Sequence, residues 1–391
     1  MDVLARITSG SVEICFRSIS SVLKQKHPLA LANITQSKNS EFLGYLHSFR
    51  GLAILKIVFG HAVAAACIGV YGVFDVSNPI LMISEVFYHD STLYFAIISG
   101  ILFSQVLKPR GYFKFYKSKL KHIVLPYLFF TVVLTLIKIN FRQFSNFQDG
   151  LQWTVSKIWM NFIFGKANFA LWYIPILIAL FLVTPVLEFL QKRNSITKIC
   201  FFIMMILPLF ISRVQNLTAY HVSVETIIYF TGAYAFGMYL GEDLNDKLKW
   251  LKTYQFQITL LGYISSAWLF YLYIYDLDAV GMLSLKETVF YIQKISFAII
   301  FILWFKTFQD KQPHWLIPIA SDSFSIYFIH GSLLYTLLPW VMSILKPITL
   351  QSLKVVLGAF ILGSLVMVLS MLMVAISKKL FGKYSRMIVG A

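Results

Sequence analysis

Long apolar stretches, separated by short polar segments, run along the chain from residue 46 onward. Most are close to the ~20 residues that an α-helix needs to cross a bilayer, so they predict an all-α, polytopic membrane protein with about ten transmembrane helices. We expect no soluble catalytic domain beside them. The predicted spans are residues 46–71, 90–107, 122–141, 169–190, 197–213, 222–241, 253–275, 288–308, 317–340 and 351–377.

The segments outside these spans are more polar. Residues 1–42 are predicted to be a cytosolic N-terminal segment that can form an amphipathic surface helix, and they lack the apolar core of a cleavable signal peptide. Residues 43–377 form the predicted membrane domain, and residues 378–391 a short cytosolic tail. The segment LQWTVSKIWMNFIF, residues 151–164, is short and amphipathic, which predicts a helix at the membrane interface.

Composition supports the membrane class. Hydrophobic residues make up 58% of the 391 residues and charged residues only 13%, and the mean hydropathy is +0.72. In a soluble protein a net charge of +17 would suggest nucleic acid, but here basic loops that orient the chain explain it. The three cysteines have no metal-ligand spacing, so the sequence predicts neither a metal site nor a permanently bound cofactor.

The basic loop between the second and third predicted spans sets the orientation. It contains no acidic residue, and because basic loops are retained inside the cell, it should be cytosolic. Alternation from there places both termini in the cytosol. The basic residues of this loop are Lys108, Arg110, Lys114, Lys117, Lys119 and Lys121.

Arg50 and His61 are ionisable residues in the first predicted span, eleven positions apart. On a helix this separation is ~16 Å along the axis and brings both side chains to within roughly 20° of one face. Arg50 can be an anchor at the headgroups or can bind an anion. His61, near mid-membrane, can bridge helices or act as a base, because ionisable groups at this depth are costly and commonly functional.

Arg50 and His61, in SFRGLAILKIVFGHA, resemble the Arg-x10-His signature of acyltransferase family 3, the integral membrane O-acyltransferases that modify cell-envelope glycans in bacteria. Further motifs follow in the order of the family, and the resemblance spans residues 43 to 377. His47 replaces a common acidic residue, and lysines replace arginines in the basic run. The other motifs are YFAIISGILFSQ (Ser99, Gly100), YKSKLKHIVLPYLFF (Pro126, Tyr127), LWYIPILIALFLVTPVL (Trp172, Tyr173), GAYAFGMYLG (Gly237, Gly241) and SDSFSIYFIHGSLLY (Ser323, Tyr327, His330).

The resemblance implies an enzyme of the bacterial inner membrane. Its co-substrate would be a cytosolic acyl-CoA, most commonly acetyl-CoA. Its acceptor would be a hydroxyl of an envelope polysaccharide or lipid-linked sugar, such as lipopolysaccharide O-antigen or exopolysaccharide. His61 would be the general base, or would carry the acyl group in a two-step transfer. Arg50 would bind pyrophosphate or polarise the thioester. Donor-binding candidates are Lys117, Lys119, Lys121, His122, Tyr127 and Trp172.

Two further groups have open alternatives. Ser323, Tyr327 and His330 share one helix face, where they line the donor cavity or form a polar seam between helices. His89, Asp90 and Glu225, at predicted outer ends, contact the acceptor or are solvated helix ends.

The expected partners are membrane lipid, acyl-CoA and the glycan acceptor. Association with glycan-assembly proteins is compatible with this role, and nucleic acid is not expected. An alternative is a transporter or exporter of lipid-linked sugars. Because the Arg-x10-His span has no second copy, as a transporter built from repeats would show, the enzyme is favoured.

Overall fold

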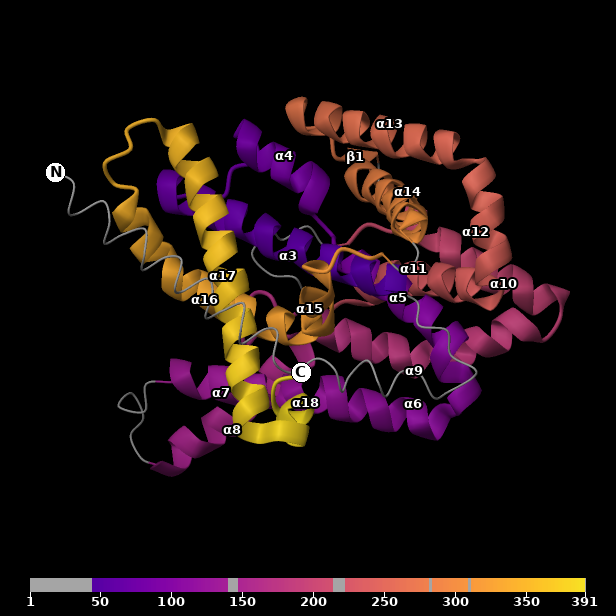
Figure 1. Ribbon diagram of the computed structural model, residues 1–391, viewed down its shortest axis with the longest axis horizontal. Helices are drawn as coiled ribbons and strands as arrows, with labels where there is room; N and C mark the ends of the chain where they lie inside the picture. Colours follow the sequence, from indigo (N-terminus) through magenta and orange to yellow (C-terminus); the bar gives the residue numbers. More distant parts are fainter. Residues whose placement is uncertain (1–43, 140–146, 214–221, 281–282, 309–310, 391) are drawn as a thin grey trace. The chain divides into compact units, whose positions relative to one another are not determined.

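The computed structural model describes residues 44–139, 147–213, 222–280, 283–308 and 311–390 (Figure 1). The predicted N-terminal segment, residues 1–42, lies outside the described residues. Within them, eight helical segments are long and apolar enough to cross a membrane. The protein is therefore an all-helical multi-pass membrane protein, which confirms the predicted class.

The eight segments follow one another with short connections. They are α3 (Gly44–Tyr71); α4 (Pro79–Tyr88) with α5 (Thr92–Leu102) and two short turns, ending at Arg110; α6 (Tyr112–Lys119) with a π-turn (Leu120–Val124) and α7 (Leu125–Lys138); α9 (Tyr173–Lys192); α13 (Gln255–Ile274); α14 (Leu285–Thr307); α16 (Ser323–Ile344); and α17 (Gln351–Phe381), continued to α18 (Ser385–Ile388).

The two other predicted spans are also helices. α10 (Ser195–Ile206) with a 3-10 turn to Phe210 is apolar but short. α11 (Val224–Glu242) is long enough to cross a membrane, but its Tyr, Thr and Gly residues lower its mean hydropathy. Much of α11 packs against other helices and not against lipid. The remaining helices and strands are α8 (Phe147–Phe164), α12 (Leu244–Thr253), α15 (Leu316–Ser321) and the antiparallel pair β1 (Ala279–Val280) and β2 (Leu283–Ser284).

α3 lies at the centre of the helix packing. It contacts α4, α5, α14, α15, α16 and α17 (Figure 1). Phe49, Ile54, Val58 and Ala62 are fully buried along its length. A helix with protein on several sides can carry ionisable side chains, because its neighbours supply the hydrogen bonds that lipid cannot.

The second span is broken near its middle. The sequence predicts a start at residue 90, whereas the apolar helix already begins at Pro79, with the side chain of Asn78 accepting hydrogen bonds from its first turn. α4 then ends at Tyr88, and Asp90 adopts a left-handed backbone conformation with φ of 51°. Asp is one of the few residues that tolerate this conformation. The break places His89 and Asp90 between two helices, inside the bundle.

α5 and α11 approach so closely that only glycine fits between them. A Cβ on Gly237 would lie 2.2 Å from the carbonyl oxygen of Ile97, and a Cβ on Gly100 would lie 2.2 Å from that of Tyr234. Small residues allow this backbone contact in membrane helices, where van der Waals packing replaces the hydrophobic drive. The glycine spacing of the GAYAFGMYLG segment therefore has a packing reason.

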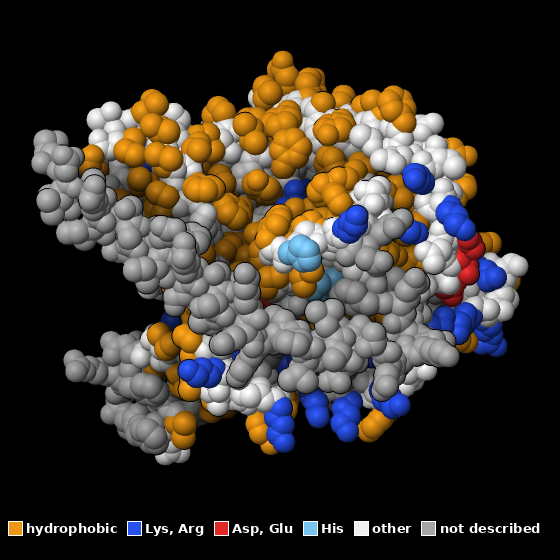
Figure 2. Space-filling model, in the orientation of Figure 1, with side chains coloured by type: hydrophobic (Ala, Val, Ile, Leu, Met, Phe, Trp, Pro, Cys, Tyr) orange, Lys and Arg blue, Asp and Glu red, His pale blue; other side chains and the backbone are white. Residues whose placement is uncertain are grey.

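The surface in Figure 2 separates apolar from basic side chains. Hydrophobic side chains cover the upper part of this face, and Lys and Arg side chains gather along the lower edge, over α6. α8 confirms a helix in the predicted amphipathic segment, and most of its residues are exposed. Its location at the membrane interface stays a prediction.

We predict that Gly237→Ala destabilises the protein, because the added methyl group forces α5 and α11 apart. The melting temperature in detergent should fall by several degrees, as measured by thermal unfolding followed by size-exclusion chromatography. Gly262→Ala is the matched control: a Cβ there meets no atom closer than 3.5 Å, and alanine favours a helix by about 1 kcal/mol. Equal melting temperatures for the two variants would contradict the close-packing explanation.

Candidate active site

His61 and His330 meet as a pair where α3 crosses α16. Nδ1 of His61 lies 3.1 Å from Nε2 of His330. The two ring planes are nearly parallel, at 3°, and the ring centroids are 5.3 Å apart. His330 is fully buried and His61 half-buried. The structure thus brings together two histidines that the sequence places 269 positions apart.

The hydrogen bonds show which ring nitrogen of each histidine carries the proton. Nδ1 of His330 lies 2.8 Å from the carbonyl oxygen of Tyr327, which can only accept, so Nδ1 carries the proton. Nε2 of neutral His330 is then an acceptor, and Nδ1 of His61 donates to it. Nε2 of His61 is left with its lone pair, and no described residue hydrogen-bonds it. This nitrogen is available as a base or nucleophile.

The connection between α8 and α9 packs beside the histidine pair. The ring of Phe169 meets His61 edge-on, with centroids 5.1 Å apart. The hydroxyl of Tyr327 donates to the carbonyl of Ala170, and Nδ2 of Asn168 donates to Oγ of Ser332 at 2.9 Å. These bonds fix residues 165–172 against α16, so that Phe169 is held at His61.

Arg50 is held at the other end of α3 by the segment before α16. Its Nε donates to the carbonyl of Ala320 at 3.0 Å, and its Nη2 lies 3.2 Å from Nδ1 of His47. Nε2 of His47 in turn lies 3.2 Å from the carbonyl of Ile317. His47 therefore orients the guanidinium from the position where the family resemblance led us to expect a carboxylate.

Arg50 lines a pocket of about 470 Å³, which we call the basic pocket. Phe324 and Ile123 are among its apolar walls. Its charged and titratable lining comprises Arg50, Lys119, His122, Asp322, Lys378 and Arg386. Because four Lys and Arg side chains face one carboxylate, the pocket suits an anion with several negative charges.

The other predicted donor residues do not line this pocket. Lys117 and Lys121 are exposed, and Nζ of Lys117 lies over the ring of Phe113. The hydroxyl of Tyr127 donates to the carbonyl of Phe162 at 2.6 Å and so ties α7 to α8. Trp172 is buried against Tyr173 and Phe230. Donor roles for these residues stay predictions.

The predicted face of Ser323, Tyr327 and His330 has three different environments. Only His330 hydrogen-bonds His61, while Tyr327 bonds the 165–172 segment. Oγ of Ser323 is buried and has no hydrogen-bond partner in the described part of the chain. The structure therefore separates the three residues by environment, and the roles of Ser323 and Tyr327 stay predictions.

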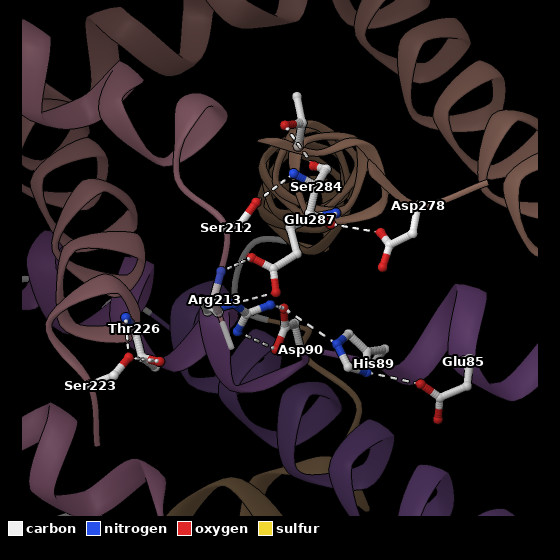
Figure 3. A network of polar contacts seen from close by, with 11 residues as sticks. Glu85, His89, Asp90, Ser212, Arg213, Ser223, Thr226, Asp278, Ser284 and Glu287 are labelled. Carbon is white, nitrogen blue, oxygen red and sulfur yellow. Dashed lines mark hydrogen bonds and ion pairs between the residues drawn. The ribbon is translucent and has the colours of Figure 1, made fainter. Parts of the chain in front are cut away.

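A second polar cluster, the Arg213 network, joins Glu85, His89, Asp90, Arg213 and Glu287 (Figure 3). Nη1 and Nη2 of Arg213 contact the two oxygens of Asp90 at 3.2 and 2.5 Å. Nε of Arg213 lies 3.2 Å from Glu287, whose other oxygen accepts from the Arg213 backbone N–H at 2.7 Å. The guanidinium stacks on Tyr229.

Arg213 keeps its charge within this network. Burial alone would lower the pKa of its guanidinium, but the Asp90 carboxylate raises that pKa above its ordinary value. A buried forked pair of this kind holds both partners in one geometry. The network therefore ties the break after α4 to the segment between α10 and α11.

The predicted acceptor-side residues fall into different places. His89 bridges Glu85, at 2.9 Å, and Asp90, at 3.6 Å. It follows Tyr88, which packs against the residue before His61: a Cβ on Gly60 would lie 2.7 Å from Cβ of Tyr88. Asp90 is occupied by Arg213. Glu225 lies in the first turn of α11, outside the Arg213 network as the described residues form it.

The family comparison decides between the interpretations of this arrangement. A family model described as an acyltransferase domain, of the acyltransferase 3 family, matches residues 43–375. The chain belongs to this family. It is a membrane-bound acyltransferase. No curated protein and no solved structure matches the chain.

The acyltransferase also contains buried charges that the sequence reasoning missed. Arg213 and Glu287 belong to the network above, and Lys294 is fully buried with Nζ 3.2 Å from the carbonyl of Phe87. Nζ of Lys56, in α3, lies over the ring of Tyr88 at 5.0 Å. Lys56 and Lys294 could have been identified from the sequence, because each is an ionisable residue within an apolar span. Among the described residues no group of three His, Cys, Asp or Glu could hold a metal ion.

We predict that Arg213→Gln strongly destabilises the acyltransferase, because it leaves the carboxylates of Asp90 and Glu287 buried without their counter-charge. Breaking a buried pair costs about 3–5 kcal/mol, whereas an exposed pair contributes about 0–1 kcal/mol. Thermal unfolding in detergent should show a large loss for Arg213→Gln. Lys249→Gln, which removes the exposed pair with Asp246, should change little. If both variants melt alike, the network does not hold the bundle.

Proposed function

We propose that the acyltransferase transfers an acyl group, namely acetyl from cytosolic acetyl-CoA, to a hydroxyl of a bacterial envelope glycan or lipid-linked sugar. The histidine pair is the observation that carries the proposal, because it leaves Nε2 of His61 unprotonated beside the bundle core. The enzyme would lie in the inner membrane with the basic pocket facing the cytosol, where basic loops are retained.

The chemistry needs one base in the right tautomer. Nε2 of His61 takes the proton of the acceptor hydroxyl while the oxygen attacks the thioester carbonyl carbon. The carbon–sulfur bond then breaks, and the CoA thiolate takes the proton back from Nε2. His330 supports the positive charge that forms on His61 by accepting its Nδ1–H, and it holds the ring in place.

The basic pocket would hold the phosphates of the donor. Arg50 and Lys119 are half-buried in it, where a guanidinium and an ammonium group can neutralise a diphosphate. His61 is not part of the pocket lining and lies ~16 Å further along α3. Ile54 and Ile57, between them on the same face, are buried. The thin pantetheine arm must therefore pass by displacing these side chains.

The acceptor would approach from the side of the Arg213 network. His89 is half-buried and follows Tyr88, which packs against Gly60 beside His61; Glu85 orients His89 through Nδ1. We assign the acceptor contact to His89 rather than to Asp90, because Arg213 already binds both oxygens of Asp90. With these assignments, donor and acceptor would reach His61 from opposite sides.

We predict that His61→Ala lowers the turnover number about 10²- to 10⁴-fold, the usual contribution of a general base. His330→Ala should lower the turnover number by a smaller factor, because His61 remains as the base but loses the hydrogen-bond acceptor for its Nδ1–H. His330→Gln should restore part of that loss, since its amide oxygen can accept from Nδ1 of His61. Transfer of labelled acetyl from acetyl-CoA to envelope glycan by the purified protein measures all three.

His314→Ala, which changes an exposed histidine, is the matched control and should leave transfer unchanged. Unchanged transfer in a folded His61→Ala protein would exclude His61 as the base. Release of one equivalent of CoA before the acceptor is added would indicate the two-step route through an acyl-histidine. Mass spectrometry of envelope polysaccharides with and without the protein identifies the acceptor class.

A further inference from the structure

The end of the chain forms one wall of the basic pocket. Lys378 is in the last turn of α17, and Arg386 lies in α18; both face the pocket together with Ser385 and Gly390. From the sequence, residues 378–391 are expected to be only a short tail. In the structure they contribute two of the four Lys and Arg side chains of the pocket lining.

This wall is fixed by packing. Val389 is buried with Val374 and Ile329, and its N–H donates to the carbonyl of Ser385 at 2.8 Å. A Cβ on Gly390 would lie 3.3 Å from the ring of Phe328. Arg386 therefore extends from a docked turn, and the apolar contacts of Val389 hold this turn at the pocket.

The pocket cations lie at two levels of exposure. Arg50 and Lys119 are half-buried, whereas Arg386 is exposed and the side chain of Lys378 is 44% exposed. Nζ of Lys378 lies 2.5 Å from Oδ1 of Asp322, the only carboxylate of the pocket lining within the described residues. The inner pair can bind one anionic group and the outer pair a second one.

Coenzyme A carries its negative charge in two places: a diphosphate beside the pantetheine arm, and a 3′-phosphate at the far end on the ribose. We propose that Arg386 and Lys378 bind this 3′-phosphate, so that the chain end completes the donor site. The proposal rests on the proposed function, in which Arg50 and Lys119 hold the diphosphate. The planar fork of Arg386 suits a terminal phosphate. Asp322 opposes the phosphate by its charge and by its pairing with Lys378.

The test compares acetyl-CoA with acetyl-3′-dephospho-CoA, which lacks only this phosphate. We expect Arg386→Gln and Lys378→Gln to raise KM for acetyl-CoA roughly 10- to 100-fold, the usual effect of losing a charge-assisted hydrogen bond. Neither variant should change kcat, or KM for the dephospho donor. Asp322→Asn should lower KM for acetyl-CoA. Lys379→Gln, an exposed lysine in the same last turn of α17 but outside the pocket lining, is the control and should change neither KM.

Thermal shifts of the protein with CoA and with dephospho-CoA measure binding without transfer. If the wild type binds both equally, or if Arg386→Gln weakens both donors alike, the 3′-phosphate assignment is wrong. An effect of Arg386→Gln only in nanodiscs with anionic lipid would assign the two cations to lipid headgroups instead. Wild-type protein that binds CoA through Arg386 but transfers no acyl group would refute the proposed function and support this site. Active wild type with unaffected variants would refute this site alone.

Discussion

The hydrogen bond between His61 and His330 is the interaction on which the candidate active site depends. An imidazole can present its lone pair on either nitrogen, and only a partner decides which. Here the decision begins at a backbone carbonyl, that of Tyr327, which cannot donate. It passes through His330 to Nδ1 of His61. The helix geometry of α16 thus sets the protonation pattern on α3, and the parallel planes of the two rings suit the hydrogen bond between their edges.

The same requirement explains why α3 lies at the centre of the bundle. Lipid offers no hydrogen bonds, so each ionisable group of α3 needs a partner from a neighbouring helix. Arg50 obtains a carbonyl before α16, Lys56 the face of Tyr88 at the end of α4, and His61 the ring of His330. Each partner belongs to an element that contacts α3. The chemistry and the packing of this helix therefore constrain each other.

The sequence predicted the elements well, but not the partners. Apolar length identified the spans, because a bilayer imposes a length that a sequence displays. Arg50, His61 and His330 stood out as ionisable groups in those spans. Their pairing depends on how α3 crosses α16, which no local pattern encodes. Arg213 and Glu287 were not singled out from the sequence, since nothing near either residue indicates the other, 74 positions away.

The basic segment around Lys119 also shows what the sequence could not predict, namely which of its basic residues line the pocket. Charge alone could not separate Lys119 and His122, which line the pocket, from Lys117 and Lys121, which are exposed. The π-turn that starts at Leu120 and the contact of Lys119 with Phe181 make that distinction. The role of the chain end could not be predicted from the sequence for a related reason. Arg386 is positioned by Val389, a single apolar residue whose contacts lie in α16 and α17.

The buried isoleucines between the basic pocket and His61 give the two ends of α3 separate tasks in the proposed reaction. A phosphate cannot enter an apolar layer without losing its hydration, so recognition by charge stops at Arg50. An uncharged arm can pass. Cations beside His61 would oppose the positive charge that its ring must gain as a base, and water there would compete with the acceptor hydroxyl for the thioester. Ile54 and Ile57 keep the phosphate-binding cations away from the imidazole, so strong donor binding need not weaken the base.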